Sequence, residues 1–275
     1  MFNFIYIIIS KSKHIFLTLK RLQAIILLCI FNVTEIFATA PSPWQMGFQK
    51  ASSPLMVEIE KFHNFLLIII FSISLFIIGL VSYTCYKFYH TRNKIPSKFS
   101  DNLTLETIWT IIPVIILIII SIPSFRLLRL AENAPPSDFT VKVIGNQWYW
   151  TYSYPDHGGF SFDSYMIQDN QIKKNQYRLL EVDNKIYIPK DSVVKFIITA
   201  SDVIHSFALP ALGIKTDAIP GKINETWTKV ENTGTYYGQC SELCGINHGF
   251  MPIVLEVVEK ETFNHWIENS RKNFS

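Results

Sequence analysis

The sequence predicts a mostly β sandwich or barrel that is anchored by an N-terminal hairpin of two transmembrane helices. The chain has 275 residues, of which 49% are hydrophobic and only 17% are charged, whereas about 25% is usual for soluble domains. The apolar excess lies in three blocks within the first half. The second half instead alternates apolar and polar residues in short segments between turn residues, which is typical of an all-β domain.

Residues 1–40 are predicted to form a signal or leader segment. An apolar run over 22–33 follows four basic residues, and Ala38-Thr39-Ala40 fits a small-residue cleavage site. An uncleaved N-terminal anchor is the alternative, because another apolar stretch precedes the basic residues and Pro41 would directly follow the cut.

Residues 41–136 are predicted to form the membrane hairpin, with spans at about 65–86 and 108–128. Each span is close to the roughly 20 apolar residues that cross a bilayer. The short connection between them is basic, and its cations are Lys87, Arg92, Lys94 and Lys98. The positive-inside rule places this connection in the cytoplasm and the rest of the chain outside.

Residues 137–275 are predicted to form one extracytoplasmic β domain. Period-two alternation begins at Phe139, and Trp148, Trp150, Tyr152 and Tyr154 share one parity. Further strands are predicted at 179–183, 185–188, 193–199, 226–230, 235–237 and 253–258. A short helix at about 260–271 is expected to close the domain.

The distribution of charge argues against a nucleic-acid partner. Residues 1–136 carry twelve Lys and Arg against six Asp and Glu, whereas residues 137–275 carry thirteen against sixteen. A basic membrane segment joined to a mildly acidic domain lacks the clustered basic face of a nucleic-acid-binding protein.

Metal-binding side chains are concentrated in the twelve residues 240–251. This segment contains Cys240, Cys244, His248 and Met251. His205 follows a predicted core strand, so its loop can reach the same end of a sandwich. Thiolate, imidazole and thioether are ligands that favour copper or zinc over magnesium or calcium.

Several kinds of site fit these residues. Two Cys and two His could bind zinc, although zinc has little use for a thioether and the spacing is unusual. A mononuclear blue copper site would leave one thiolate unused. A dinuclear copper site is another option, in which both thiolates bridge two copper ions and each copper also binds one imidazole. This arrangement uses both cysteines and both histidines. The two cysteines could instead form a disulfide in an oxidising compartment.

The motifs resemble those of the cytochrome c oxidase subunit II family. The segment 238–252, GQCSELCGINHGFMP, is similar to the dicopper (CuA) loop of that family. The segment 147–152, QWYWTY, resembles its aromatic motif, and 202–205 and 212–221 resemble further family segments. The resemblance runs from about Trp44 to the end of the chain.

The resemblance implies a cupredoxin-like sandwich with a dinuclear copper centre. By this resemblance Cys240 and Cys244 bridge two coppers, His205 and His248 are terminal ligands, and Met251 is a weak ligand. Glu242 would bind one copper through its backbone carbonyl, and its carboxylate would reach a magnesium site shared with subunit I.

The same resemblance implies an electron-transfer role in a haem–copper terminal oxidase. Trp148 matches the position where electrons from cytochrome c enter, and Glu106 matches a glutamate near a proton path. The cytochrome c docking acids correspond to Asp156, Asp183 and Asp202. The implied partners are subunit I, other oxidase subunits, cytochrome c and membrane lipid.

The leader favours the bacterial plasma membrane as the location, with the mitochondrial inner membrane as the alternative. Three other functions remain possible from the sequence. A quinol oxidase subunit would lack the copper ligands. A nitrous-oxide reductase domain would lack the hairpin and Glu106. A copper carrier or assembly protein would hold exchangeable ligands.

Overall fold

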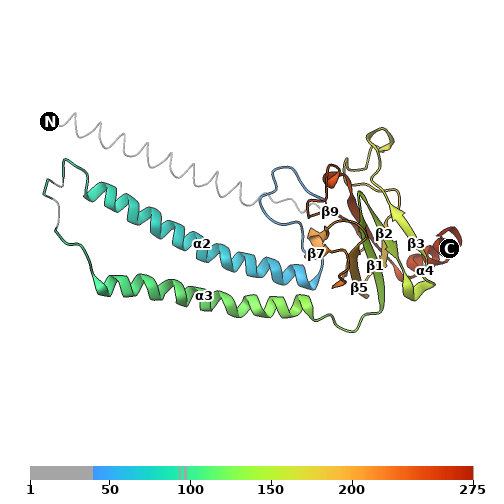
Figure 1. Cartoon of the computed structure of the whole chain (residues 1–275), viewed down its shortest axis with the longest axis horizontal. Helices are drawn as coiled ribbons and strands as arrows, with labels where there is room; N and C mark the ends of the chain where they lie inside the picture. Colours follow the sequence, from blue (N-terminus) through green and yellow to red (C-terminus); the bar gives the residue numbers. More distant parts are fainter. Residues whose placement is uncertain (1–39, 93, 96–97, 275) are drawn as a thin grey trace, which may run out of the picture. The chain divides into compact units, whose positions relative to one another are not determined.

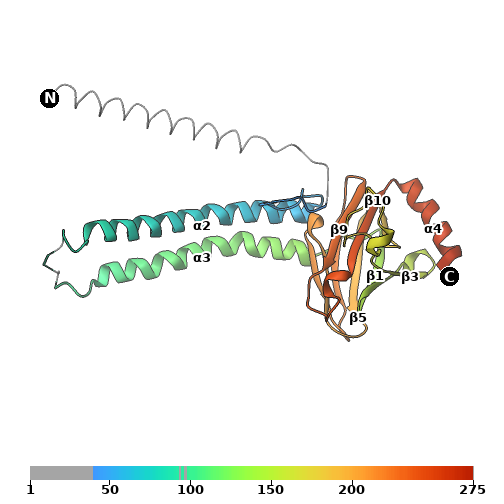
Figure 2. The same cartoon turned by 90° about the horizontal axis from the view of Figure 1, so that it is seen from above.

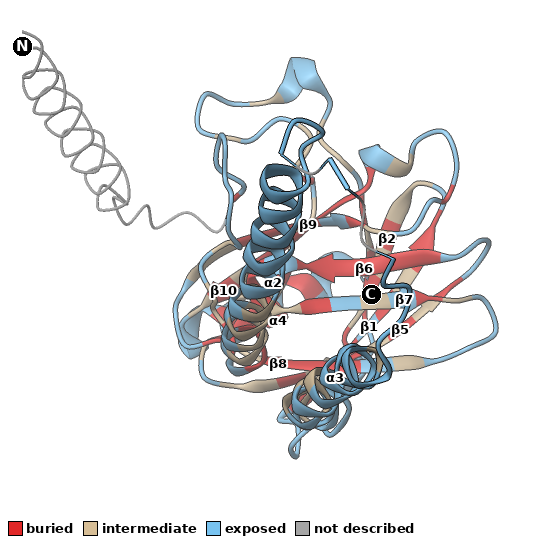
Figure 3. Cartoon of the chain, turned by 90° about the vertical axis from the view of Figure 1, so that its left-hand side faces the viewer, coloured by how far each residue is buried: buried red, intermediate tan, exposed pale blue. Residues whose placement is uncertain are grey.

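The computed structural model describes residues 40–92, 94–95 and 98–274. The predicted leader lies outside the described residues, except for Ala40. Two long helices come first, α2 (Pro54–Lys87) and α3 (Leu103–Glu132), and they lie side by side (Figures 1 and 2). Both exceed the length that a membrane span requires, and neither buries its most apolar stretch within this chain. Figure 3 shows their surfaces as exposed, which suits helices that face lipid or other proteins.

The ends of both helices follow local sequence signals. Ser53 caps α2 by accepting a hydrogen bond from the N–H of Met56 at 3.0 Å, and Pro54 occupies the first turn. Asn102 caps α3 in the same way. Helix α3 includes the whole predicted span, so Pro113 and Pro123 both lie inside the helix, a position that membrane helices tolerate.

The rest of the chain folds into a β-sandwich of two five-stranded sheets in the described residues. The first sheet has the order β3-β2-β1-β5-β8 and the second the order β4-β10-β9-β6-β7. The strands are β1 (Phe139–Asn146), β2 (Tyr149–Ser153), β3 (Ser161–Ser164), β4 (Ile186–Pro189), β5 (Val193–Ala200), β6 (His205–Leu209), β7 (Ile214–Ala218), β8 (Asn224–Lys229), β9 (Gly234–Cys240) and β10 (Pro252–Val258). Helix α4 (Lys260–Phe274) follows β10.

Side-chain alternation explains how the sheets face each other. In β5 every second residue is buried, from Val194 to Ala200, and β1 buries Val141 and Val143 in the same manner. The buried residues of both sheets form one apolar core (Figure 3). The mostly β, cupredoxin-like sandwich behind a two-helix hairpin that the sequence predicts is therefore confirmed.

Several predicted elements differ from those observed. The predicted strand at 179–183 is not a strand, because Leu179 has a φ of 66° and the segment keeps only an isolated bridge at Val182. Strands β3, β6 and β7 were not predicted. All five residues of β6 are buried, so it has no alternation that could reveal it.

Candidate metal centre

The pairing of β6 with β9 brings the first two ligand candidates together. His205 begins β6 and Cys240 ends β9, and the antiparallel register places Phe207 opposite Cys240. Because antiparallel strands place the start of one beside the end of the other, His205 and Cys240 lie at one end of the sheet. The His205 Nδ1 lies 3.9 Å from the Cys240 Sγ.

The loop between β9 and β10 supplies the remaining candidates. It turns through Gly245, whose φ of 123° is one that other residues rarely adopt, and a Cβ there would meet the Trp148 ring at 3.0 Å. A 3₁₀ turn (His248–Phe250) then leads into β10. Cys244 and Met251 are thereby folded back beneath the loop, where both are buried.

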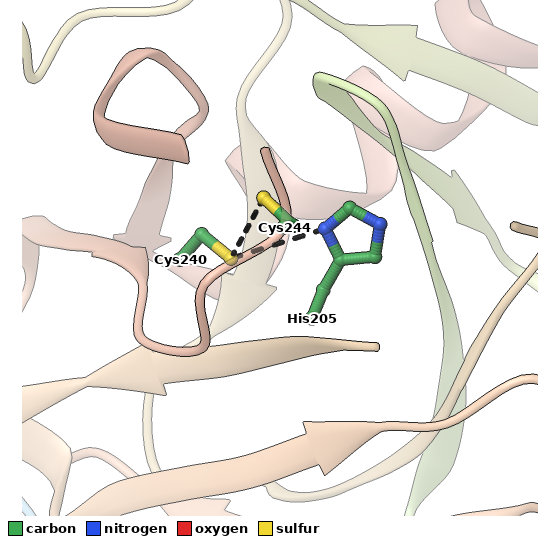
Figure 4. A group of neighbouring side chains, drawn as sticks. All are labelled: His205, Cys240 and Cys244. Carbon is green, nitrogen blue, oxygen red and sulfur yellow. Dashed lines mark hydrogen bonds between the residues drawn. The ribbon is translucent and has the colours of Figure 1, made fainter. Parts of the chain in front are cut away.

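The sulfur and nitrogen atoms of these residues converge. The two cysteine Sγ atoms lie 3.9 Å apart, and the Cys244 Sγ lies 3.6 Å from both the His248 Nδ1 and the Met251 Sδ. The Glu242 carbonyl oxygen lies 3.4 Å from the Cys240 Sγ. In Figure 4 the sulfurs of Cys240 and Cys244 and one ring nitrogen of His205 point toward a common centre.

This arrangement fits a soft metal ion and not a disulfide. A disulfide needs an S–S distance near 2.05 Å, and both cysteines are free. His205 is fully buried and Cys244 is 3% exposed. Two buried thiols, two imidazoles, a thioether and a carbonyl within one loop cluster match the donor set that copper prefers.

The two thiols differ in acidity. Burial raises the pKa of the Cys240 thiol, but hydrogen bonds with His205 and the surrounding backbone outweigh it and lower this pKa to about 7. Burial and the charge on Cys240 together raise the pKa of Cys244 to about 12. At neutral pH Cys240 is therefore partly ionised and Cys244 is protonated, so binding a metal through both sulfurs releases more than one proton.

Asp202 fixes the orientation of the His205 ring. Its Oδ1 accepts a hydrogen bond from the His205 Nε2 at 2.9 Å, which leaves Nδ1 free on the side of the thiols. The backbone N–H groups of Gln147 and Val203 also donate to this carboxylate, at 2.7 and 2.6 Å. Burial alone would raise the pKa of Asp202, but these hydrogen bonds hold it below its usual value.

The turn between β1 and β2 supports the metal-binding loop. The Gln147 side-chain amide and the Trp148 indole N–H both donate to the carbonyl of Cys244, at 2.8 and 3.2 Å. Sequence reasoning selected Trp148 but assigned no structural role to the Gln147 side chain. The position of Gln147 at the start of the aromatic motif was the available signal.

The other predicted site residues lie away from the cluster. Asp156 and Asp183 are exposed, and each accepts backbone hydrogen bonds from its own surroundings, Asp156 from Thr140 and Asp183 from Tyr165 and Asn184. The Glu242 side chain is also exposed, although the carbonyl of this residue belongs to the cluster.

Glu106 lies in the first turn of α3, far from the metal site. Leu130, near the other end of this helix, accepts a hydrogen bond from Trp227 of β8. Twenty-four residues separate Glu106 from Leu130, so at 1.5 Å per residue they are roughly 36 Å apart along the helix.

The fold and the site define a membrane-anchored cupredoxin-like protein with a thiolate-rich metal centre. Comparison with known proteins agrees. The family profile described as "Cytochrome C oxidase subunit II, periplasmic domain" matches residues 139–258, and the one described as its transmembrane domain matches residues 41–127.

Individual relatives give the same result. The chain is 57% identical to a probable cytochrome c oxidase subunit 2 of Rickettsia bellii, over 92% of this chain and 94% of that one. It is 45% identical to cytochrome c oxidase subunit 2 of Phytophthora megasperma, over 85% and 90% of the two chains. A solved subunit II periplasmic domain from Bradyrhizobium japonicum is 53% identical, covering 52% of this chain and all of its own, with a TM-score of 0.49.

The chain belongs to the cytochrome c oxidase subunit II family. It is therefore a membrane subunit of a haem–copper oxidase complex, and its family implies a copper centre. The grouping of His205, Cys240 and Cys244 is consistent with copper.

Proposed function

We propose that this subunit holds a dinuclear copper (CuA) centre that receives electrons one at a time from cytochrome c and passes them to haem in subunit I. The observation that carries the proposal is the convergence of both thiols on each other and on the two imidazoles, with 3.6 to 3.9 Å between neighbouring ligand atoms. When bound, a copper pair bridged by two thiolates gains and loses one electron with little rearrangement of its ligands.

Each ligand candidate has a proposed role. Cys240 and Cys244 lie between the two imidazoles, which supports bridging thiolates with His205 and His248 as terminal ligands. Met251 lies beside Cys244, and the Glu242 carbonyl lies beside Cys240. These positions support one weak additional ligand for each copper.

The protein frame around the site keeps the ligands fixed and dry. The Trp150 indole donates to the Met251 carbonyl at 3.1 Å, and Asp202 holds the His205 ring. Because these hydrogen bonds hold the ligand side chains in place, little reorganisation is needed when the charge of the centre changes. This property suits electron transfer better than bond-making chemistry.

We also propose where electrons and cytochrome c approach. Trp148 is half-buried, and its indole contacts the Cys244 carbonyl, which supports it as the point where electrons enter. Asp156, Asp183 and Asp202 are exposed and would attract a basic cytochrome c. By the family resemblance, Gly158 and Gly159 stand where further acids would be expected, so we expect this attraction to be modest.

Two further roles rest on the family resemblance. The exposed carboxylate of Glu242 is proposed to reach a magnesium ion shared with subunit I. Glu106, in the first turn of α3 next to the basic connection, is proposed to serve a proton path into subunit I and so proton translocation. The basic connection supports a cytoplasmic location for Glu106, and we propose the bacterial inner membrane as the site of the complex.

Copper analysis of the full chain in detergent tests this proposal. We expect two coppers per chain and a seven-line electron paramagnetic resonance pattern, because one unpaired electron is then shared by two copper nuclei of spin 3/2. Cys240→Ser should abolish this signal, whereas Cys85→Ser, which removes an exposed thiol of α2, should leave it unchanged. One copper per chain with a four-line pattern would overturn the assigned roles of the two cysteines.

A further inference from the structure

A cavity lies between α2 and α3 at the ends of these helices that adjoin the β domain. Its volume is about 350 Å³, at the lower end of the range for ligand pockets. The apolar walls come from Phe62 and Phe65 of α2 and from Leu127 and Leu130 of α3. The Trp227 indole donates to the Leu130 carbonyl, so this end of the cavity is held next to the sandwich.

The cavity lies where the bilayer core meets its headgroup layer. The predicted spans begin at residue 65 and end at residue 128, and the lining residues of α2 and α3 fall on both sides of these boundaries. Any lipid beside this part of the hairpin would place its phosphate at the level of the cavity and its acyl chains against the apolar walls.

The charges around the cavity leave one cation without a partner. Glu58 and Lys61 line it and pair with each other at 2.6 Å. Arg126 also lines the cavity and is exposed. Among the described residues, no ion pair involves Arg126. The lining therefore carries a net charge of +1 from these three groups.

We propose that this cavity binds one anionic phospholipid, with the phosphate on Arg126 and the first part of an acyl chain between Phe62, Phe65, Leu127 and Leu130. A guanidinium can bind two phosphate oxygens at once, and the net positive charge of the lining attracts an acidic headgroup. A zwitterionic headgroup fits less well, because its ammonium group would need Glu58, which Lys61 already neutralises.

Photo-crosslinking of the full chain in phosphatidylcholine nanodiscs tests the site without any substitution. The probe is a trace of photoactivatable phosphatidylglycerol, and labelled peptides are mapped by mass spectrometry. We expect labelling at 58–65 and 123–130, suppressed by excess unlabelled phosphatidylglycerol but not by the same excess of phosphatidylcholine. Equal suppression by both lipids, or labels spread evenly along the spans, would contradict the proposal.

Substitution of the arginine then tests the charge. Arg126→Gln should lower labelling about fivefold, the effect expected for one basic residue at an anionic lipid surface. Arg126→Lys should keep most of it, and Arg129→Gln, which removes a cation outside the cavity lining, should match the native chain. If Arg126→Gln labels as strongly as the native chain, the cavity is not a lipid site. The same conclusion follows if another oxidase subunit crosslinks to Leu127 in the assembled complex.

Discussion

At the residue scale, Asp202 joins parts of the site that are far apart in sequence. Its carboxylate accepts hydrogen bonds from the His205 ring and from the backbone N–H groups of Val203 and Gln147. The Gln147 side chain in turn donates to the Cys244 carbonyl. A carboxylate on the outer nitrogen of a metal-binding imidazole fixes the ring and increases its basicity. Asp202 is therefore a positioning residue, whatever it contributes to docking.

We expect Asp202→Asn to keep the copper centre but to weaken it. All ligands remain, but the loss of the carboxylate makes His205 a poorer donor, so the reduction potential should rise and copper affinity should fall roughly tenfold to a hundredfold. A redox titration and a copper competition assay measure both. Asp183→Asn removes a comparable exposed acid away from the site. If both variants share the native potential, Asp202 does not position His205.

The candidate ligands could be picked out from the sequence because their chemistry is unusual and four of them lie within twelve residues. The supporting residues could not. Asp202 looked like a surface acid and Gln147 like part of an aromatic segment, since their roles depend on loops that meet only in the folded sandwich. One of these hydrogen bonds joins residues that are 55 positions apart, and the other joins residues that are 97 positions apart. No local sequence pattern can therefore reveal them.

At the element scale, the metal centre depends on how closely β6 approaches β9. Gly238 of β9 lies against the backbone of β6, and a Cβ at this position would collide with the carbonyl oxygen of Ala208. The absence of a side chain therefore lets the two strands pair, and their pairing sets the distance between His205 and Cys240.

Gly238→Ala should both destabilise the domain and disturb the copper centre. The clash is with backbone, which cannot rotate away as a side chain can, and crowding of this kind typically costs about 1–3 kcal/mol. Chemical denaturation and copper counting would follow the two effects. Gly249→Ala adds a methyl group within the ligand loop with nothing inside 4 Å. Equal stability of the two variants would show that the strands can separate without cost.

Prediction of the strands succeeded where the residues alternate or where β-branched residues dominate. The strands β1, β5 and β10 alternate or are strongly β-branched, and their ranges are close to those expected. Strand β6 is buried on both faces and contains small and polar residues, so neither periodicity nor propensity identified it. The false strand at 179–183 has good β formers, but tertiary contacts place Leu179 in a left-handed conformation.

At the scale of the whole molecule, each membrane helix is attached to the sandwich by hydrogen bonds near its end. Ser53 at the start of α2 donates to the Leu212 carbonyl at 2.7 Å, and Trp227 of β8 donates to Leu130 near the end of α3. The apolar core itself runs from Phe139 to Ile267 and includes no residue of either helix. We propose that residues 137–275 fold independently, with 41–136 serving as the anchor.

Separated from the hairpin, residues 137–275 should unfold in one cooperative transition and bind two coppers. The cut leaves the main core intact, although it removes Ala40 from a small satellite cluster. The Trp227 indole and the Leu212 carbonyl exchange their partners on the helices for water, which costs little. Near-ultraviolet circular dichroism during denaturation, with a copper count, measures both properties. A fragment that lacks fixed tertiary structure, while the full chain in detergent keeps it, would show that the helices are needed for folding.

The burial of Ala40 has a consequence for the timing of maturation. This residue is 4% exposed and packs with Val182, Tyr237 and Val254 of the sandwich. A peptidase must grip several extended residues around the bond that it cuts, and a folded domain would withhold Ala40 from it. A leader cut at this position would therefore have to be removed during export, before β9 and β10 have assembled, since the finished sandwich would protect the junction.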